Sequence, residues 1–269
     1  MASKLLPAML EAGLPVEAIW SRNRSKAEAL ALSGIEAKST AGSGKAVRVL
    51  DELEEAAVED TLCLLAVSDD AIAEVAGRLG AAEVFALALA HTSGSVDAMA
   101  LALYAQQYGC FYPLQTFTES QKPDFAAIPF CLTGSDESVL SGLEMMAVAL
   151  GAPLGHIHRL SDLQRRELHL AAVFANNFSN RCFALAAELL EKSNLSFDLL
   201  KPLIADTARN AIEVDPRKVQ TGPAARGDAA TIARHQRQLQ QNPELRRLYD
   251  LLTASIQGMR APEDDPKKS

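Results

Sequence analysis

Residues 61–80 read TLCLLAVSDDAIAEVAGRLG, and this stretch decides the fold class. Thr61–Val67 is a short, continuously apolar run, which is typical of a parallel strand that is buried on both faces. The run stops at three polar residues. After them the apolar residues recur every three or four positions, as on one face of a helix: Ile72, Val75, Ala76 and Leu79. The sequence therefore predicts a strand that leads directly into a helix.

The same alternation continues on both sides of this unit. Downstream, Val84–Ala90 predicts another strand. Upstream, the spacing predicts a helix over Leu5–Leu10, ended by Ala12-Gly13, and then a strand over Val16–Trp20. Strands that alternate with helices at intervals of about twenty to thirty residues indicate a parallel sheet with helices on both faces. The predicted fold class is α/β, a doubly wound parallel sheet.

Weaker patterns complete this half of the chain. A helix with Ser25 as its N-cap is predicted over Lys26–Leu32, and Ile35–Lys38 is a weak candidate for a third strand. Leu50–Ala57 predicts a short acidic helix and Glu137–Leu150 a longer one. Three short strands extend the sheet on its far side, at Cys110–Phe111, Phe130–Thr133 and Gly155–His158.

No strand pattern follows Ser161. Helical spacing covers the rest of the chain in four segments, Leu163–Leu190, Phe197–Ile212, Ala229–Gln241 and Pro243–Ile256. We therefore predict a boundary near Pro153–Ser161 between two domains, residues 1–157 with the sheet and residues 158–258 with helices alone, followed by a disordered tail at 259–269. The first of these helices is too apolar to stay exposed, so we expect the helical domain to form a homodimer.

The composition excludes several classes of function. The formal net charge is −8 and the pI about 5.2, so neither nucleic acid nor a membrane surface is an expected partner. No apolar run approaches the roughly 20 residues that cross a bilayer. The cysteines lie far apart, without CxxC or metal-ligand spacing, which favours buried thiols in a reducing compartment and no metal site: Cys63, Cys110, Cys131 and Cys182. A cytoplasmic protein is expected.

The chain begins with a helix where a sheet of this kind normally begins with a strand and a glycine-rich loop. That strand is central in the usual order 3-2-1-4-5, and the loop binds a phosphate at a helix N-terminus. We therefore expect Met1 to lie inside a longer motif. Thr40–Lys45 (TAGSGK) does not supply the loop, because a P-loop needs Ser or Thr after its lysine and Ala46 stands there.

The polar turn after the Val16–Trp20 strand points to a cofactor. An acidic residue at this place would bond the ribose hydroxyls of NAD, whereas SRNRS (residues 21–25) offers hydroxyls and two guanidinium groups. This favours the additional phosphate of NADP. A solvated turn with ordinary surface arginines is the alternative interpretation. The predicted cofactor-binding residues here are Ser21, Arg22 and Asn23.

Five segments in a fixed order carry a resemblance to a known family. They are HTSGS (91–95), GCFYPLQTF (109–117), IPFCL (128–132), ELHLAAVFANNFSN (167–180) and QTGPAARGD (220–228). Together they resemble the Rossmann-like proteins with a C-terminal DUF2520 domain, from Met1 to about Ile256. The resemblance implies an NADP-dependent oxidoreductase similar in layout to pyrroline-5-carboxylate reductase and the hydroxyacid dehydrogenases, with a nucleotide-binding domain and a helical domain that commonly dimerises. It implies no substrate, and this sequence departs from the pattern in lacking the first strand and its glycine loop.

The ends of the strands supply candidate site residues. Hydride transfer needs positioning and a proton donor or acceptor near the reacting carbon. His91 could donate that proton, or it could be a structural hydrogen-bonding residue. Tyr112 and Gln115 could bind a substrate carboxylate or carbonyl, although Tyr112 could instead belong to the core. The predicted cofactor contacts at these strand ends are Val67, Ser68, Asp69, Thr92, Ser93 and Gly94, of which Ser68 and Asp69 are also expected to cap the following helix.

The long helix carries a polar stripe in an otherwise apolar sequence, formed by His169, Asn176, Asn177 and Asn180. The resemblance implies that this helix gives a Lys and an Asn to the active site of related dehydrogenases. Here His169 and Asn177 are the corresponding catalytic candidates, and a histidine can act as acid or base near neutral pH. Asparagines bonded between packed helices are the alternative. The remaining predicted substrate-binding residues are Asn176, Asn180 and Arg226, and Arg226 could instead be a structural clamp on a carboxylate.

Two functions remain open from the sequence. The first is an NADP-dependent oxidoreductase that acts on a small polar carbonyl, imine or hydroxy compound in the cleft between the domains. The second is a nucleotide-binding sensor or interaction module without catalysis, built on the same frame.

Overall fold

The structure is a computed structural model that describes residues 1–269 except 39–46, 57, 59, 83–87, 119–121 and 260–269. Its contacts divide the chain into two compact units, Met1–Ser179 and Asn180–Ser269, and each is described by itself. The sequence placed the boundary near Pro153–Ser161. The division falls later because the helix that follows Ser161 bonds to the sheet unit through several side chains, described below.

The sheet of the first unit is mostly parallel. Strands β3, β4 and β5 are parallel neighbours, β5 and β6 are antiparallel, and β6 and β7 are parallel. Two further strands, β1 and β2, pair with each other in a separate parallel sheet, and no strand in the described residues bridges the two sheets. The strands are β1 (Ala18–Ile19), β2 (Arg48–Val49), β3 (Leu62–Leu65), β4 (Ala88–His91), β5 (Gln107–Pro113), β6 (Phe130–Gly134) and β7 (Ile157–Arg159).

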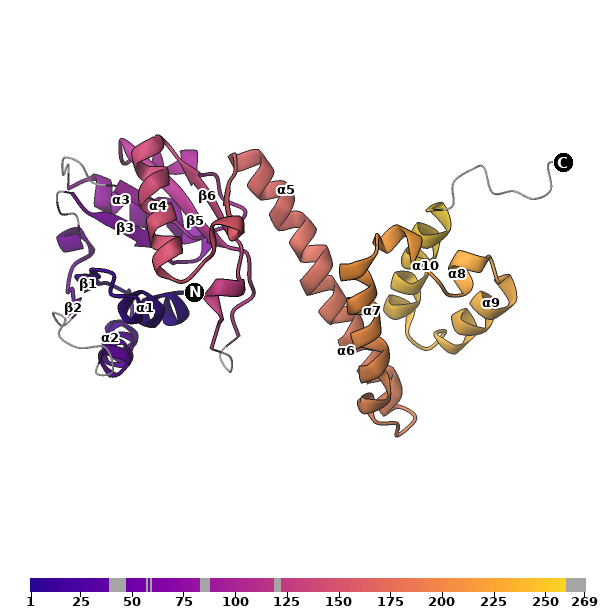
Figure 1. The fold of residues 1–269 in the computed structure, drawn as a ribbon. Coiled ribbons are helices and arrows are strands. Elements are labelled where there is room, and N and C mark those ends of the chain that lie inside the picture. Colours follow the sequence, from indigo (N-terminus) through magenta and orange to yellow (C-terminus); the bar gives the residue numbers. More distant parts are fainter. Residues whose placement is uncertain (39–46, 57, 59, 83–87, 119–121, 260–269) are drawn as a thin grey trace. The chain divides into compact units, whose positions relative to one another are not determined.

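Helices cover both faces of the five-stranded sheet (Figure 1). Phe111 and Phe130 point to one face, where they pack with Leu5 of α1 and Leu143 of α4. Cys110 and its neighbours on the other face pack with residues of the helix α5. The helices of this unit are α1 (Ala2–Glu11), α2 (Arg24–Lys38), α3 (Ile72–Gly80), α4 (Glu137–Ala149) and α5 (Asp162–Ala172), followed by the π-helical segment η6 (Val173–Phe178). The predicted α/β class is therefore confirmed.

Short 3-10 turns join these elements. They are η1 (Leu53–Ala56), η2 (Asp69–Ala71), η3 (Ala98–Leu101), η4 (Phe125–Ala127) and η5 (Leu154–His156). The predicted acidic helix at Leu50–Ala57 is thus only the turn η1.

Two predictions near the N-terminus are wrong. The helix α2 begins at Arg24, because the side chain of Asn23 and not that of Ser25 accepts from the backbone N–H of Lys26, at 3.1 Å. The helix continues to Lys38, so Ile35–Lys38 is helical and not a strand. The strand that pairs with β1 is instead β2, two residues long. The predicted connection Thr40–Lys45 lies outside the described residues.

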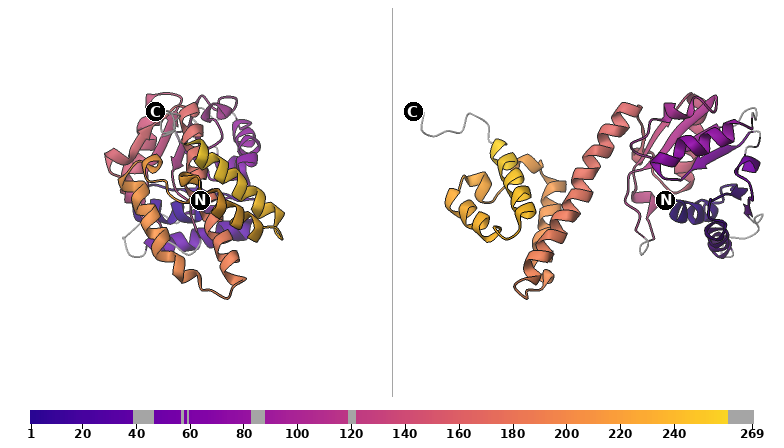
Figure 2. Two further views of the ribbon diagram at one scale, coloured as in Figure 1. Left: turned by 90° about the vertical axis from the view of Figure 1, so that its right-hand side faces the viewer. Right: turned by 180° about the vertical axis from the view of Figure 1, so that it is seen from behind.

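Up to residue 259, where its described residues end, the second unit contains helices and no strand, as the sequence predicts (Figure 2). They are α6 (Ser179–Glu191), η7 (Phe197–Leu200), α7 (Lys201–Glu213), η8 (Pro216–Lys218), α8 (Pro223–Arg226), α9 (Ala229–Gln238) and α10 (Pro243–Gly258). The prediction that all four cysteines are buried holds for Cys110 and Cys131, whereas Cys63 is only partly buried and Cys182 is exposed on α6. None of the described helices is long and apolar enough to cross a membrane.

Candidate active site

The loop after β4 is enclosed and held by its own side chains. His91, Thr92 and Ser93 are buried. The backbone N–H of Ser93 donates to Nδ1 of His91 at 3.2 Å, and the Ser93 hydroxyl accepts from the N–H groups of Ser95 and Val96, both at 3.1 Å. Because β3, β4 and β5 are parallel, their carboxyl ends share one edge of the sheet, which is where ligands bind in such folds. These bonds fix the loop at that edge of the sheet, and we call residues 91–95 the wall.

Tyr112 and His169 meet beside this wall. The Tyr112 hydroxyl lies 3.0 Å from Nδ1 of His169, and the two rings are edge to face with centroids 5.8 Å apart. A Cβ atom on Gly94 would lie 2.5 Å from Nδ1 of His169 and 2.7 Å from Cζ of Tyr112. Only glycine at position 94 leaves room for the two rings. The structure thus brings together three predicted site residues from three segments, and we call Tyr112 and His169 the dyad.

Burial raises the pKa of Tyr112 to about 12, since desolvation disfavours the phenolate. The phenol therefore keeps its proton at neutral pH. A neutral phenol can donate to Nδ1 of a neutral imidazole or accept from Nδ1–H of a charged one. In either state the bond fixes the orientation of the His169 ring and leaves Nε2 as the nitrogen for chemistry.

His91 differs from His169 because no part of it reaches solvent. The pKa of His91 is lowered to about 4, first by burial and then by the positive charge of Arg165. The backbone of Asp97 and the carboxylates of Asp162 and Asp69 partly oppose this shift. An enclosed, neutral imidazole that accepts from Ser93 N–H suits a structural role better than the proton transfer that the sequence suggested.

The lowered pKa of His91 predicts a loss of stability in acid. Between pH 6.5, the ordinary value, and pH 4, the unfolded chain binds a proton that the folded state excludes, so the free energy of unfolding falls by as much as about 3 kcal/mol. We expect His91→Gln to flatten the dependence of chemical denaturation on pH in this window. The matched variant His158→Gln, at an exposed histidine, should keep the full slope. Equal slopes in the His91 variant and the wild type would contradict this assignment.

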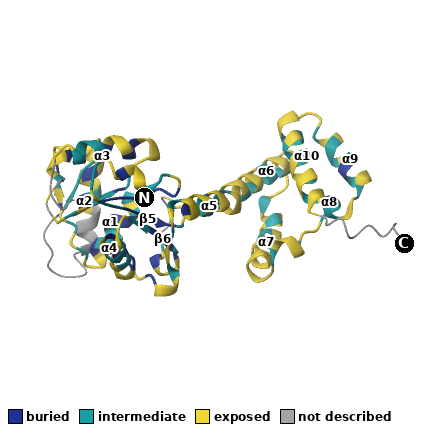
Figure 3. Cartoon of the chain, turned by 90° about the horizontal axis from the view of Figure 1, so that it is seen from above, coloured by how far each residue is buried: buried dark blue, intermediate teal, exposed yellow. Residues whose placement is uncertain are grey.

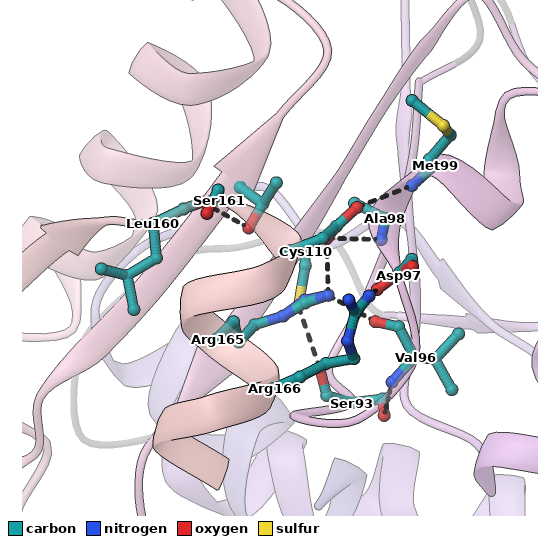
Figure 4. Close-up of polar contacts among 12 residues, drawn as sticks. Ser93, Val96, Asp97, Ala98, Met99, Cys110, Leu160, Ser161, Arg165 and Arg166 are labelled. Carbon is teal, nitrogen blue, oxygen red and sulfur yellow. Dashed lines mark hydrogen bonds and ion pairs between the residues drawn. The ribbon is translucent and has the colours of Figure 1, made fainter.

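The helix α5 is fastened to the loop that follows the wall (Figure 4). The Asp162 carboxylate accepts from the backbone N–H of Ala98 at 2.8 Å and from Nη2 of Arg165 at 2.7 Å. Arg165 Nη2 also donates to the carbonyl of Val96, and Arg166 pairs with Asp97. Three of these contacts join α5 to residues 96–98, and they set where α5, and with it His169, stands against the sheet.

Arg165 is a site residue that sequence reasoning missed. It is 0% exposed, and its Nε and Nη1 atoms have no hydrogen-bond partner among the described residues. Arg165 lies four residues before His169, so both side chains share one face of α5. That spacing was readable from the sequence, but the burial of a charged residue was not.

A second contact joins the same segments beyond the dyad. Nδ2 of Asn176, in η6, donates to the Thr116 hydroxyl at 2.5 Å. The neighbouring Gln115 is exposed, and its Oε1 accepts from the Thr116 N–H at 2.8 Å. Asn177 is exposed, and no bond from its side chain is found in the described part of the chain. Thr116 was not among the predicted site residues, although Tyr112 and Gln115 of the same loop were.

At the end of β3 the predicted cofactor contacts are open to solvent. Val67, Ser68 and Asp69 are all exposed. Ser68 is the N-cap of η2 without a side-chain cap, and the Asp69 carboxylate accepts from the Ser95 hydroxyl. The prediction that one of these side chains caps the following helix is therefore wrong, because Asp69 turns to the β4 loop instead.

The two arginines of the turn after β1 differ in their ion pairs. Arg24 pairs with Glu28 and Asp51, whereas Arg22 is exposed and has no ion-pair partner among the described residues. The Ser21 hydroxyl accepts from the N–H of Asn23 at 3.2 Å. One free guanidinium and one hydroxyl fit the adenosine phosphate of NADP at this turn.

Two predicted substrate residues belong to the other unit. Asn180 and Arg226 are exposed there. Arg226 ends α8, which begins after Gly222 with its φ of +99°, and Asp228 caps α9 by accepting from the N–H of Thr231 at 3.0 Å. No group of three metal-ligating side chains gathers within the described residues of either unit.

Comparison with known proteins gives one family match and several similar structures. The model of the domain of unknown function DUF2520 matches residues 128–256. A "putative NADP oxidoreductase" from Bacteroides fragilis is 34% identical over 95% of this chain and 93% of its own, with a TM-score of 0.81. A Thermotoga maritima protein is 22% identical over 96% and 95%, with a TM-score of 0.67. No match is found among curated proteins.

A more distant likeness reaches the reductases. Pyrroline carboxylate reductase from Plasmodium falciparum, solved with NADP bound, is 11% identical over 96% of this chain and 94% of its own, with a TM-score of 0.53. At this identity the likeness shows the fold alone, which is Rossmann-like.

Proposed function

Since the chain belongs to the family of Rossmann-like proteins with a C-terminal DUF2520 domain, as its motifs predicted, we propose that it is an NADP-dependent oxidoreductase. It transfers a hydride between NADP(H) and a small polar carbonyl, imine or hydroxy compound. The observation that carries this proposal is the dyad. The Tyr112 hydroxyl lies 3.0 Å from Nδ1 of His169 and fixes the orientation of its ring, and the absence of a Cβ atom at Gly94 leaves space for both rings. His169 is therefore positioned to donate a proton to a substrate.

The cofactor, when bound, supplies the hydride, and the protein supplies binding and the proton. Ser21, Arg22 and Asn23 would hold the adenosine phosphate. The exposed turn at Val67–Asp69 would lie along the ribose and pyrophosphate side, and Thr92–Gly94 would lie near the nicotinamide. The assignments at Val67–Asp69 and Thr92–Gly94 follow from the parallel strands β3 and β4, whose carboxyl ends share one edge of the sheet. The assignment at Ser21–Asn23 rests on the hydroxyl and the guanidinium of that turn.

His169 moves the proton. In the charged form its Nδ1–H donates to the Tyr112 oxygen and its Nε2–H donates to the oxygen or nitrogen of the substrate. After the proton leaves Nε2, the neutral ring keeps its Nδ1–H bond to Tyr112. The phenol never ionises, which agrees with the pKa of Tyr112 of about 12. In the direction of oxidation, Nε2 takes the proton back.

Turnover of NADPH with a panel of ketones and cyclic imines tests this function. We expect tight NADPH binding, and oxidation of NADPH that depends on an added substrate. Binding without turnover of any member of the panel would contradict catalysis and favour the alternative, a nucleotide-binding sensor.

The free guanidinium of Arg22 predicts the cofactor preference. Arg22→Ala should lower the ratio of NADPH to NADH affinity by roughly 10 to 100-fold, since a hydrogen bond to a charged group contributes about 1.5 to 3 kcal/mol. Arg24→Ala is the matched control, because its guanidinium is already paired with Glu28 and Asp51. Fluorescence titration with both cofactors measures the ratio. A ratio unchanged by Arg22→Ala, or lowered equally by both variants, would remove Arg22 from the cofactor site.

We also propose that the helical unit forms a homodimer. Within its described residues only Ala224 and Ile232 are buried apolar side chains, and large ones such as Leu203 and Ile212 are exposed (Figure 3). A unit with so few buried apolar side chains needs another protein surface to cover its exposed ones. A second copy of the same chain can provide that surface wherever the protein is made.

Light scattering after gel filtration tests the dimer. The mass should be twice 28.8 kDa for the wild type and close to 28.8 kDa for a Leu203→Glu, Ile212→Glu double variant. Leu103→Glu, at an exposed leucine of the first unit, should leave the dimer intact. A wild-type protein of monomer mass would contradict the proposal.

A further inference from the structure

The bond between Asn176 and Thr116 lies on the same two segments as the dyad. Tyr112 and Thr116 are four residues apart on the segment that leaves β5, and His169 and Asn176 are seven residues apart on α5 and η6. The helix thus meets this segment at two points, each through one polar pair at hydrogen-bond distance. Seven residues of helix span about 10 Å, so the pair of Asn176 and Thr116 lies at about that distance from the dyad.

The second pair keeps unused hydrogen-bonding groups. Asn176 uses one N–H, and its carbonyl oxygen and second N–H have no partner among the described residues. Thr116 accepts through its hydroxyl and retains its own O–H proton for donation. Both residues are exposed, so a ligand can reach them. Together they present donors and an acceptor at one place.

The pair is also uncharged. No ion pair or charged hydrogen bond to Asn176 or Thr116 occurs in the part of the chain that the structure describes. A primary amide or a hydroxyl can donate to the Asn176 carbonyl and accept from the O–H or N–H groups. A carboxylate has no proton to donate, so it would face the Asn176 carbonyl oxygen without a bond.

The backbone at Asn176 supports a specific role for this residue. It lies in η6, a π-helical segment, and π-helices make up well under 1% of residues in globular proteins and are frequent at functional sites. The wider turn changes which side chains face the sheet. Asn176 meets Thr116 there, whereas no side-chain bond of its neighbour Asn177 occurs in the described chain.

We propose that Asn176 and Thr116 form a specificity site that recognises an uncharged amide or hydroxyl at the far end of the substrate. The substrate class is therefore bifunctional, with a reducible carbonyl or imine at the dyad and a neutral polar group several bonds away. This proposal rests on the proposed oxidoreductase function and names the substrate class of that site.

The test compares three matched ketones in NADPH oxidation, 7-oxooctanamide, 7-oxooctanoate and 2-octanone. We expect kcat/KM to be highest for the amide, by roughly tenfold, since one or two hydrogen bonds of about 0.5 to 1.5 kcal/mol separate it from the others. Asn176→Ala and Thr116→Val should remove this preference by raising KM for the amide toward that for 2-octanone. Asn210→Ala, at an exposed asparagine of α7, is the control and should keep the preference.

The outcomes separate the two proposals. Turnover of all three ketones without preference, or a preference that both variants retain, overturns the specificity site and leaves the oxidoreductase function standing. No turnover of any ketone, with NADPH bound, overturns the function and the specificity site with it. Loss of all activity in both variants would show a structural role, which thermal denaturation of these exposed-site variants detects directly.

Discussion

Replacing His169 by glutamine lowers kcat for NADPH oxidation by about 10² to 10⁴-fold, the usual contribution of a positioned general acid. Glutamine can still accept from the Tyr112 hydroxyl, so the contact between α5 and the sheet is kept. What it lacks is a group that can carry a proton to the substrate. The affinity for NADPH should stay within about twofold, because no predicted cofactor contact involves His169.

Two measurements separate this effect from misfolding. Thermal denaturation should show little change, since His169 is only partly buried. The control variant His158→Gln replaces an exposed histidine and should keep wild-type kcat. A His169→Gln protein with wild-type kcat would show that the proton comes from elsewhere, and the dyad would then be a structural contact alone.

The second large effect is expected at Gly94. An alanine here places a Cβ atom 2.5 Å from Nδ1 of His169 and 2.7 Å from Cζ of Tyr112, and real Cβ contacts are never so short. At least one ring must move, which breaks the 3.0 Å bond of the dyad. We expect Gly94→Ala to lose about 1 to 3 kcal/mol of stability, as overpacked sites do, and to lower kcat nearly as far as His169→Gln.

Gly142→Ala is the matched control for this substitution. A Cβ atom on Gly142, in the middle of α4, meets nothing within 4 Å, and alanine is the better helix former. That variant should be as stable as the wild type or more so, with unchanged kcat. A Gly94→Ala protein that retains both stability and turnover would show that the rings have space to spare and that their contact is not needed.

The sequence predicted the strands well where an apolar run had clear ends. Phe130–Thr133 matches β6, a strand inside the sheet, because such strands have few polar residues. Thr61–Val67 contains β3, but β3 is an edge strand of the five-stranded sheet in which only Leu65 is buried, so the expected burial on both faces is wrong for it. Ile35–Lys38 was misassigned, because four residues cannot distinguish the end of a helix from a short strand. β1 lies within the predicted strand Val16–Trp20, whereas β2 was missed because a strand of two residues gives periodicity nothing to detect.

The sequence identified single residues of the candidate site but did not predict which of them contact each other. His169, Tyr112 and Asn176 each stood out as polar residues in apolar surroundings. That Tyr112 would bond to His169, 57 residues away, depends on how α5 packs on the sheet, and this packing depends on Asp162 and Arg165. The π-helical turn at η6 could not be predicted either, because the predicted polar stripe on the long helix assumed the residue spacing of a regular α-helix.

The pH dependence of kcat/KM for NADPH oxidation, measured in the wild type and in His169→Gln, tests the central claim most directly. If His169 donates the proton, the wild-type rate depends on the protonation of a group that the variant lacks, so the two profiles should differ in shape. The variant should be slow and should lack this dependence on pH. A profile of the same shape in both proteins would contradict the assignment of His169 as the acid.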